Sequence, residues 1–313
     1  MIASTTPETP PTTTQPVFLV GCPRSGTTLL QRLLDAHSAI AIAPETHFVR
    51  RFWKQRRKYG SLSQDASFQR VLEDIVSMPE FSDMQLSRSD FVERAHKTDR
   101  SYGALFDLLL SSFARQRGAT VVGEKTPNHL LYIPTLSRFF PSARFLHIVR
   151  DPRAVVASWK NVPWSSGTVA GDALVWRRYI RTALEPSRRP AALHTVSYEE
   201  LTRDTERVLR GICDFLTVPF QPAMLAYHQQ DAETLDFDRE PWKRGVEGAV
   251  HRDSVEHWRQ ALGPDDIAEI EALVWREMRK LGYQLETPVR SLAAARARRL
   301  VRAILPRTNA ARP

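Results

Sequence analysis

The chain has 313 residues, 42% of them hydrophobic and 25% charged, which suits one large folded domain or two modest ones. Its apolar runs are all far shorter than the ~20 residues of a membrane-spanning helix. Because Cys22 and Cys213 are the sole cysteines, a disulfide scaffold and a cysteine-based metal site are excluded, and we expect a reducing, cytoplasmic location. The net charge of +9 is concentrated at one end, since residues 289–313 carry seven arginines and no acidic residue.

Both ends of the chain differ in composition from the middle. Residues 1–16 are rich in threonine and proline and lack an apolar core, which predicts a disordered leader rather than a signal peptide or anchor. We expect residues 17–288 to form one domain. In 289–313 the arginines alternate with apolar residues, which favours a terminal helix with a solvated basic face; weak contact with an anionic membrane or an acidic partner is the alternative. Nucleic-acid binding is not expected, because no reader motif accompanies the charge.

Short apolar runs alternate along the chain with longer segments of helical spacing. The runs predict strands at 17–20, 39–43, 119–123, 143–149 and 193–197. The longer segments predict helices near 64–78, 101–117, 128–140, 152–160, 170–184, 199–216 and 264–281. Strands that alternate with helices imply an α/β fold with a mostly parallel central sheet flanked by helices. Residues 46–100 are expected to form a helical excursion that caps the site.

Residues 21–28, Gly-Cys-Pro-Arg-Ser-Gly-Thr-Thr, follow the first predicted strand and precede a helix. Their two glycines have the spacing of a nucleotide P-loop, which aims backbone N–H groups and a helix N-terminus at one anion. Thr27 stands where a nucleoside triphosphatase has its lysine, and Arg24 supplies the positive charge from inside the loop. The loop therefore predicts a phosphate-like ligand without the full machinery for a magnesium-bound triphosphate.

Charged residues follow four of the predicted strands. Arg24, Glu45, Lys125 and Arg150 each come just after an apolar run, and the carboxyl ends of parallel strands meet at one edge of a sheet. We therefore expect these side chains to converge on one crevice. Ser158 lies eight residues after Arg150, about two turns inside the helix that Pro152 begins, so the pair can share a second anion.

These motifs resemble those of sulfotransferases that use 3′-phosphoadenosine 5′-phosphosulfate. Pro-Arg-Ser-Gly-Thr-Thr is similar to the family's 5′-phosphosulfate loop and the Arg150–Ser158 spacing to its 3′-phosphate motif, closest to the tyrosylprotein and Golgi-type branch. The resemblance implies a P-loop-containing fold for the 17–288 sulfotransferase domain, this nucleotide as cosubstrate, and no metal. The donor-binding residues that it implies are Arg24, Ser25, Gly26, Thr27, Thr28, Arg150, Ser158, Tyr198 (near the adenine) and the basic-glycine loop Lys243, Arg244 and Gly245.

The resemblance also implies a chemistry, in which a sulfuryl group moves by in-line displacement to a hydroxyl or amine of the acceptor. Glu45 matches the family's general base in the tyrosylprotein branch, and partial burial would raise its pKa. Arg24 and Lys125 would stabilise the leaving phosphate. Pro127 replaces the histidine base of the cytosolic enzymes, so that assignment fails here; His129, His147 and His47 are rival bases.

The acceptor is not predicted, and sugars, lipids, peptides and small molecules all stay open, as does the oligomeric state. Two other functions are also open. A small-molecule P-loop kinase using ATP is disfavoured by Thr27, and Asp151 is the only near fit to a magnesium ligand after a strand. A non-catalytic nucleotide-binding protein is disfavoured because binding alone would not need Glu45 beside Lys125.

Overall fold

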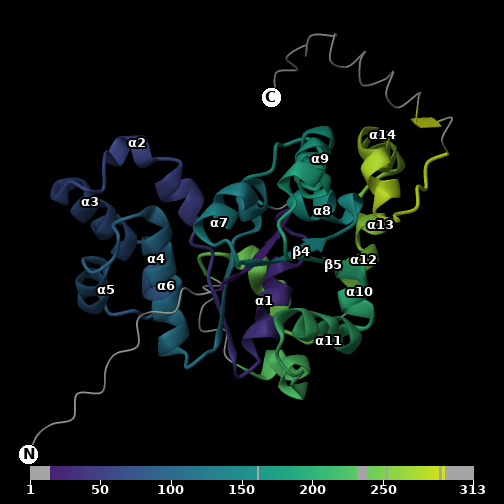
Figure 1. The fold of residues 1–313 in the computed structure, drawn as a ribbon. Coiled ribbons are helices and arrows are strands. Elements are labelled where there is room, and N and C mark those ends of the chain that lie inside the picture. Colours follow the sequence, from purple (N-terminus) through teal and green to yellow (C-terminus); the bar gives the residue numbers. More distant parts are fainter. Residues whose placement is uncertain (1–14, 161, 231–237, 251–252, 289–290, 293–313) are drawn as a thin grey trace, which may run out of the picture.

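A five-stranded parallel sheet forms the centre of the molecule (Figure 1). The computed structural model describes residues 15–160, 162–230, 238–250, 253–288 and 291–292. The strand order is β2-β3-β1-β4-β5. The strands are β1 (Val17–Gly21), β2 (Ile40–Ala43), β3 (Val121–Lys125), β4 (Arg144–Val149) and β5 (Leu193–Ser197). All five predicted strands and the predicted fold class are confirmed. The predicted leader and basic tail lie almost entirely outside the described residues.

Each face of the sheet is covered by helices, because strands such as β1 place apolar side chains on both faces. Val17 and Leu19 point to one face, where they join the apolar cluster that contains the leucines of α1 (Thr27–Asp35) and α11 (Thr205–Leu216). Phe18 and Val20 point to the other face and join the larger cluster beneath the remaining helices. A strand that is buried on both faces reads as a continuous apolar run, which is why the sequence shows it so clearly.

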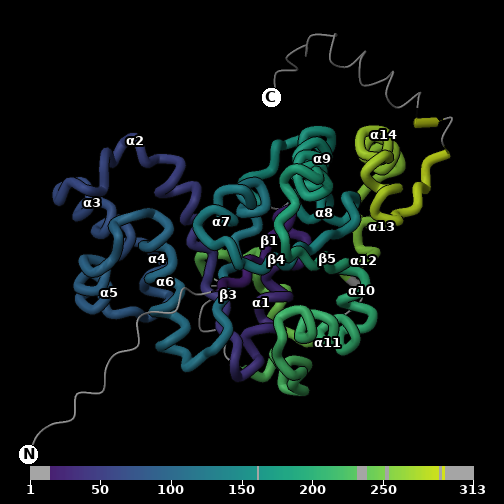
Figure 2. Tube along the Cα trace, in the orientation of Figure 1, coloured from purple at the N-terminus to yellow at the C-terminus, as the bar shows by residue number. Residues whose placement is uncertain are grey.

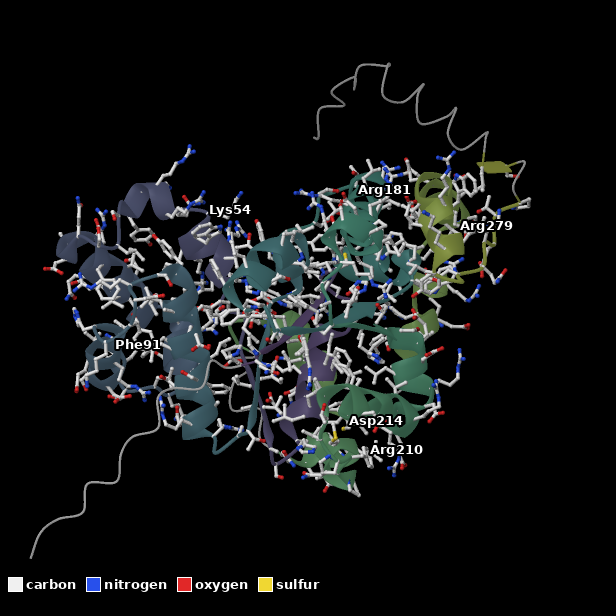
Figure 3. The ribbon with its side chains drawn as sticks, in the orientation of Figure 1. Lys54, Phe91, Arg181, Arg210, Asp214 and Arg279 are labelled. Atoms are coloured by element: carbon white, nitrogen blue, oxygen red, sulfur yellow. The ribbon has the colours of Figure 1, made fainter. Side chains whose placement is uncertain are left out.

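Each predicted helical segment is confirmed, two of them with a subdivision, whereas the short helices α12 (Asp253–Glu256) and α13 (Trp258–Ala261) were not predicted. The predicted helix at 128–140 is a 3-10 turn, η2 (Pro127–Tyr132), followed by α7 (Ile133–Phe139). The predicted helix at 199–216 is divided at Asp204 into α10 (Tyr198–Arg203) and α11. The other helices of the main body are α6 (Tyr102–Gln116), α8 (Pro152–Trp159), α9 (Val169–Leu184) and α14 (Pro264–Lys280). Figure 3 shows the charged side chains of Arg181, Arg210 and Arg279 on the outside of these helices.

Residues 46–100 are helical, as predicted, and form a lobe beside the sheet (Figure 2). The lobe contains the π-helix η1 (Val49–Trp53) and the helices α2 (Arg56–Tyr59), α3 (Asp65–Val76), α4 (Pro79–Asp83) and α5 (Arg88–Ala95). Of this segment, His47 and Arg50 reach the wall of the cavity described below. Most of the lobe therefore lies to the side of the site and does not cap it. Within the described ranges, no helix has both the length and the apolarity needed to cross a membrane.

Candidate active site

A cavity of about 1210 Å³ opens at the carboxyl ends of the strands. Of the four charged strand-end residues predicted to converge there, Arg24, Glu45 and Arg150 line the wall, whereas Lys125 does not. Tyr198, which follows β5, also contributes to the wall. The rest of the wall comes from η2, α8, α9 and the 3-10 turn η5 (Pro241–Val246). Its charged and polar members include Arg24, Thr27, Thr28, Glu45, His47, Arg50, Asn128, Arg150, Ser158, Tyr198, Glu240, Lys243 and Ser254.

The phosphate loop reaches its shape through two left-handed residues, Arg24 (φ 69°) and Gly26 (φ 102°). Glycine is required at position 26, because an added Cβ would lie 2.3 Å from Cδ2 of Tyr198. Helix α1 begins directly after it at Thr27, so the unpaired N–H groups of its first turn belong to the loop. Ser25 is wholly buried and its hydroxyl has no partner among the described residues.

The side chain of Arg24 connects the two predicted anion sites. Its Nε donates to Oγ of Ser158 at 3.0 Å, and Nη1 of Arg150 donates to the backbone oxygen of Arg24, also at 3.0 Å. Burial lowers the pKa of Arg24, and the nearby Arg150 guanidinium lowers it further. Two guanidinium groups held this close repel each other in a partly buried wall, which favours an anionic ligand between them.

Arg150 is fixed from several sides. Its Nη2 donates to the backbone oxygen of Ser254 at 2.6 Å, and its guanidinium lies 4.2 Å from the centre of the Tyr198 ring. The Tyr198 hydroxyl and Oγ of Ser254 are 2.6 Å apart. Asp151 caps the N-terminus of α8 by accepting from the Arg153 N–H at 2.8 Å, which fixes the helix that carries Ser158.

Glu45 also lines the cavity, and three basic side chains lie close to its carboxylate. Its Oε1 is 2.5 Å from Nζ of Lys125 and 3.0 Å from Nζ of Lys243, and its Oε2 is 3.7 Å from Nε2 of His47. Burial raises the pKa of Glu45, but the charges of Lys125, Lys243 and His47 outweigh it and hold the pKa well below its usual range. The expectation that burial would set a raised pKa therefore does not hold in this arrangement.

Lys125 is completely buried at the end of β3, and burial lowers its pKa to about 8 although Glu45 opposes the shift. A lysine in this state is poised to lose its proton only slightly above neutral pH. Lys125 thus forms a close pair with Glu45, which lines the cavity, but is itself buried behind the cavity wall.

The basic-glycine segment is divided by the structure. Lys243 turns inward, where its Nζ contacts Glu45 and lies 2.5 Å from Oε2 of Glu240. Gly245 lines the cavity. Arg244 is half exposed and pairs with Asp238 at 2.8 Å, away from the cavity wall. The sequence grouped Lys243 and Arg244 at the 3′-phosphate, whereas Lys243 lies at the Glu45 end of the site.

Two of the three rival histidines point away from the cavity. His129 is 1% exposed and its Nδ1 lies 2.9 Å from Oε2 of Glu124, while its neighbour Asn128 faces the cavity. His147 is buried within β4, where burial lowers its pKa to about 4. His47 does line the cavity beside Glu45, and burial lowers its pKa.

Several wall residues were not predicted from the sequence. Ser254 and Trp242 lie on short helices after residue 238, far from any strand end, so no pattern singled them out. Asn128 has no signal of its own beside Pro127, and Tyr179 has the helical spacing of a core residue of α9. The Tyr179 hydroxyl donates a hydrogen bond to Oδ1 of Asn128. Trp164 is 42% exposed and packs edge-on against Trp242, with ring centres 4.7 Å apart.

Comparison with known proteins identifies the family and agrees with this fold. The model of the sulfotransferase family matches residues 16–222. The chain therefore belongs to the sulfotransferase family, and the resemblance seen in its motifs is confirmed. The chain is similar to protein-tyrosine sulfotransferase 1 of Danio rerio (25% identity over 283 residues, covering 85% of this chain and 72% of the relative). It is also similar to protein-tyrosine sulfotransferase 1 of Homo sapiens (26% over 281 residues, covering 85% and 69%).

Two solved structures show the same fold. The sulfotransferase domain of the Synechococcus PCC 7002 olefin synthase matches with a TM-score of 0.63 at 24% identity, covering 88% of this chain and 98% of that one. The sulfotransferase domain from the curacin biosynthetic pathway matches with a TM-score of 0.59 at 21% identity, covering 87% and 99%.

Proposed function

We propose that the protein transfers a sulfuryl group from 3′-phosphoadenosine 5′-phosphosulfate to a hydroxyl or amine. The observation that carries this proposal is the hydrogen bond from Arg24 in the phosphate loop to Ser158 in the second anion site. It makes the two sites neighbours in one cavity, within reach of a single nucleotide that carries two anionic groups.

In this proposal the phosphate loop binds the 5′-phosphosulfate through the N–H groups at Gly26, Thr27 and Thr28 and the guanidinium of Arg24. Arg150 and Ser158 bind the 3′-phosphate, and Tyr198 contacts the adenosine. Because Arg24 donates a hydrogen bond to Ser158, the residues proposed to bind the two ends of the nucleotide are in direct contact.

The reaction is an in-line displacement at sulfur that uses no metal ion. The acceptor oxygen or nitrogen forms a bond to sulfur while the bond between sulfur and the bridging oxygen breaks, and that electron pair leaves with the 5′-phosphate. Glu45 takes the acceptor's proton, and Lys125 and Arg24 stabilise the growing charge on the leaving group. Sulfuryl oxygens compete with Glu45 for the Lys125 and Lys243 ammonium groups. Donor binding therefore loosens the ion pairs that hold the pKa of Glu45 down, and the carboxylate becomes a better base.

The proposed test combines donor binding with an acceptor panel. The zebrafish and human relatives are named protein-tyrosine sulfotransferases, so a tyrosine-containing peptide heads the panel. A phenol, a long-chain alcohol and a sugar glycoside complete it. We expect release of 3′-phosphoadenosine 5′-phosphate with at least one acceptor. The Glu45→Gln variant should bind the donor normally but turn over about 10²- to 10⁴-fold more slowly.

Three outcomes would change the proposal. Absence of donor binding in calorimetry would reject it. Wild-type turnover by Glu45→Gln would remove Glu45 as the base and leave His47 as the next candidate. Magnesium-dependent consumption of ATP would favour the kinase instead.

A further inference from the structure

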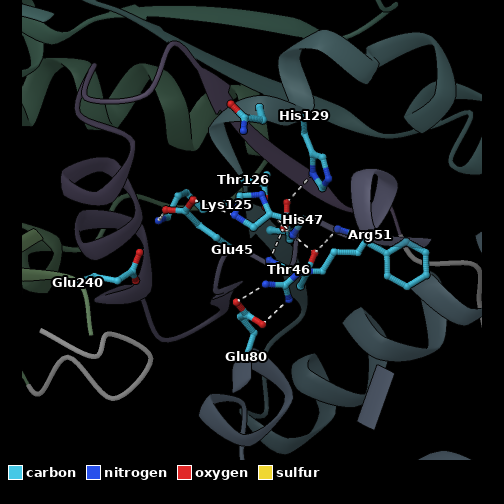
Figure 4. Close-up of polar contacts among 12 residues, drawn as sticks. Glu45, Thr46, His47, Arg51, Glu80, Lys125, Thr126, His129 and Glu240 are labelled. Atoms are coloured by element: carbon cyan, nitrogen blue, oxygen red, sulfur yellow. Dashed lines mark hydrogen bonds and ion pairs between the residues drawn. The ribbon is translucent and has the colours of Figure 1, made fainter. Parts of the chain in front are cut away.

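A buried polar cluster lies directly behind the pair formed by Glu45 and Lys125 (Figure 4). We propose that this cluster, made of Glu124, Thr46, Thr126 and His129, is a clamp that positions Glu45 against Lys125. His129 then serves the reaction as a positioning residue. The inference rests on the proposed role of Glu45 as the base.

Glu124 is the centre of the clamp and is completely buried. Its Oε1 accepts from the Thr46 N–H at 3.1 Å and the Thr46 hydroxyl at 2.8 Å, and it also accepts from the Thr126 hydroxyl. Its Oε2 is 2.9 Å from Nδ1 of His129. The carboxylate thus accepts from or contacts four polar groups on three residues, one after β2 and two in the segment after β3.

The position of the clamp explains what it can control. Ala43 pairs with Glu124 at the last register position between β2 and β3, and beyond it the sheet ladder ends. The Glu124 carboxylate replaces the missing ladder by binding the backbone N–H of Thr46. Glu45 directly precedes Thr46, and Lys125 directly follows Glu124. The clamp therefore fixes the backbone on which both members of the reacting pair stand.

The same cluster holds a turn that runs against backbone preference. His47 has φ 51°, in the left-handed region that residues with a side chain rarely adopt. Its N–H donates to Oγ1 of Thr126 at 3.3 Å. This turn carries the side chain of His47 to the cavity wall beside Glu45.

Stability alone gives little reason to keep such a cluster. Burial raises the pKa of Glu124, yet His129 and the threonine hydroxyls outweigh burial and keep the pKa below its usual value. Buried charged and polar groups generally stabilise a fold no better than apolar packing does, whereas their hydrogen bonds do fix geometry. The ring of His129 lies in the core, edge-on to Phe18 and Phe106, and its Nε2 has no partner among the described residues.

The test compares two replacements of His129. His129→Asn keeps an N–H donor near the place of Nδ1, and His129→Leu removes it. His147→Leu is the matched control, because His147 is another buried histidine, in β4 and away from Glu45. We expect His129→Leu to lower kcat about 10- to 100-fold with unchanged affinity for 3′-phosphoadenosine 5′-phosphate. His129→Asn should recover most of kcat, and His147→Leu should keep it.

A second readout does not need turnover. The ammonium group of Lys125 can be titrated by NMR in each variant. Loss of the clamp moves Glu45 away, so the midpoint of Lys125 should fall below that of the wild type in His129→Leu and stay in place in His129→Asn. If His129→Leu does not fold, Thr46→Val and Thr46→Ser form the equivalent pair, since the serine keeps the hydroxyl bonded to Glu124.

Failure of the proposed function and failure of the clamp would give different experimental results. If the wild type sulfates no acceptor, the proposed function fails, and the Lys125 titration alone decides the clamp. If the wild type is active but His129→Leu keeps its kcat and its Lys125 midpoint, the clamp is overturned and the proposed function stands. Equal losses of kcat and nucleotide affinity in His129→Leu and His147→Leu would likewise overturn it, because they would show a merely structural role.

Discussion

The Nε of Arg24 donates a hydrogen bond to Oγ of Ser158 across 3.0 Å. The two residues are 134 positions apart, one in the loop after β1 and one on α8, and each belongs to a different predicted anion site. Their contact makes the two sites parts of one surface. Under the proposed function one nucleotide contacts both sites, and the first prediction rests on this arrangement.

Replacing Ser158 by alanine should weaken binding of 3′-phosphoadenosine 5′-phosphate about 10- to 100-fold, because a hydrogen bond to a charged phosphate is lost. Calorimetry measures the effect directly. Ser166→Ala is the control, since Ser166 lines the same cavity but its hydroxyl is bonded to the backbone oxygen of Thr168 at 3.0 Å. Equal affinity in the two variants would remove Ser158 from the nucleotide site.

The neighbours Lys243 and Arg244 should differ sharply when each is replaced by alanine. Lys243 is 5% exposed and lies 3.0 Å from Glu45, so Lys243→Ala removes a cation from the place where the sulfuryl group reacts. We expect its kcat to fall about 10- to 100-fold. Arg244→Ala should stay within about twofold of the wild type, because an exposed ion pair contributes little. The opposite ranking in steady-state kinetics would return the 3′-phosphate role to Arg244.

The rate should decline on the alkaline side as Lys125 loses its proton. Its lowered pKa of about 8 means that the ammonium form is complete below that pH and is lost above it. We expect kcat/KM to fall about tenfold per pH unit above the midpoint. Glu45 has a lowered pKa, so it stays ionised through neutral pH and causes no change of kcat/KM with pH there. Lys125→Arg, which keeps its charge, should remove the alkaline limb; a limb unchanged in that variant would assign it to another group.

Alanine at position 26 should abolish nucleotide binding. The new Cβ would lie 2.3 Å from the Tyr198 ring, and φ of 102° is disfavoured for any residue with a side chain. Gly118→Ala is the matched control, because Gly118 also has a positive φ (62°) but open space around it. We expect Gly118→Ala to cost about 1 kcal/mol of stability and to bind the nucleotide normally. Thermal unfolding and calorimetry separate the two effects, and normal nucleotide binding by Gly26→Ala would contradict the loop geometry.

The strands and both anion motifs could be predicted because their signals are local. A strand buried on both faces is an apolar run, and Arg24 and Arg150 follow such runs at the carboxyl ends where parallel strands converge. The inward turn of Lys243 could not be predicted in the same way. It depends on η5 folding back across the cavity to meet Glu45, a contact between residues nearly 200 positions apart that no local pattern encodes.

The contacts of the clamp could not be predicted for the same reason, because they join segments that are distant in the sequence. Glu124 follows the strand predicted at 119–123, and no local pattern distinguishes it from other charged residues at strand ends. Only the register between β2 and β3 brings its carboxylate to the backbone of Thr46. Likewise, the choice between Asn128 and His129 as the residue facing the cavity is set by the 3-10 geometry of η2, which the helical spacing did not predict.

The most direct test of the central claim is a comparison of two nucleotides by calorimetry. If one bisphosphorylated adenosine spans both anion sites, 3′-phosphoadenosine 5′-phosphate should bind at least about 100-fold more tightly than adenosine 5′-phosphate, and Arg150→Gln should erase most of the difference. Equal affinities for the two nucleotides in the wild type would contradict the account, because they would show that the surface around Arg150 and Ser158 does not bind a 3′-phosphate.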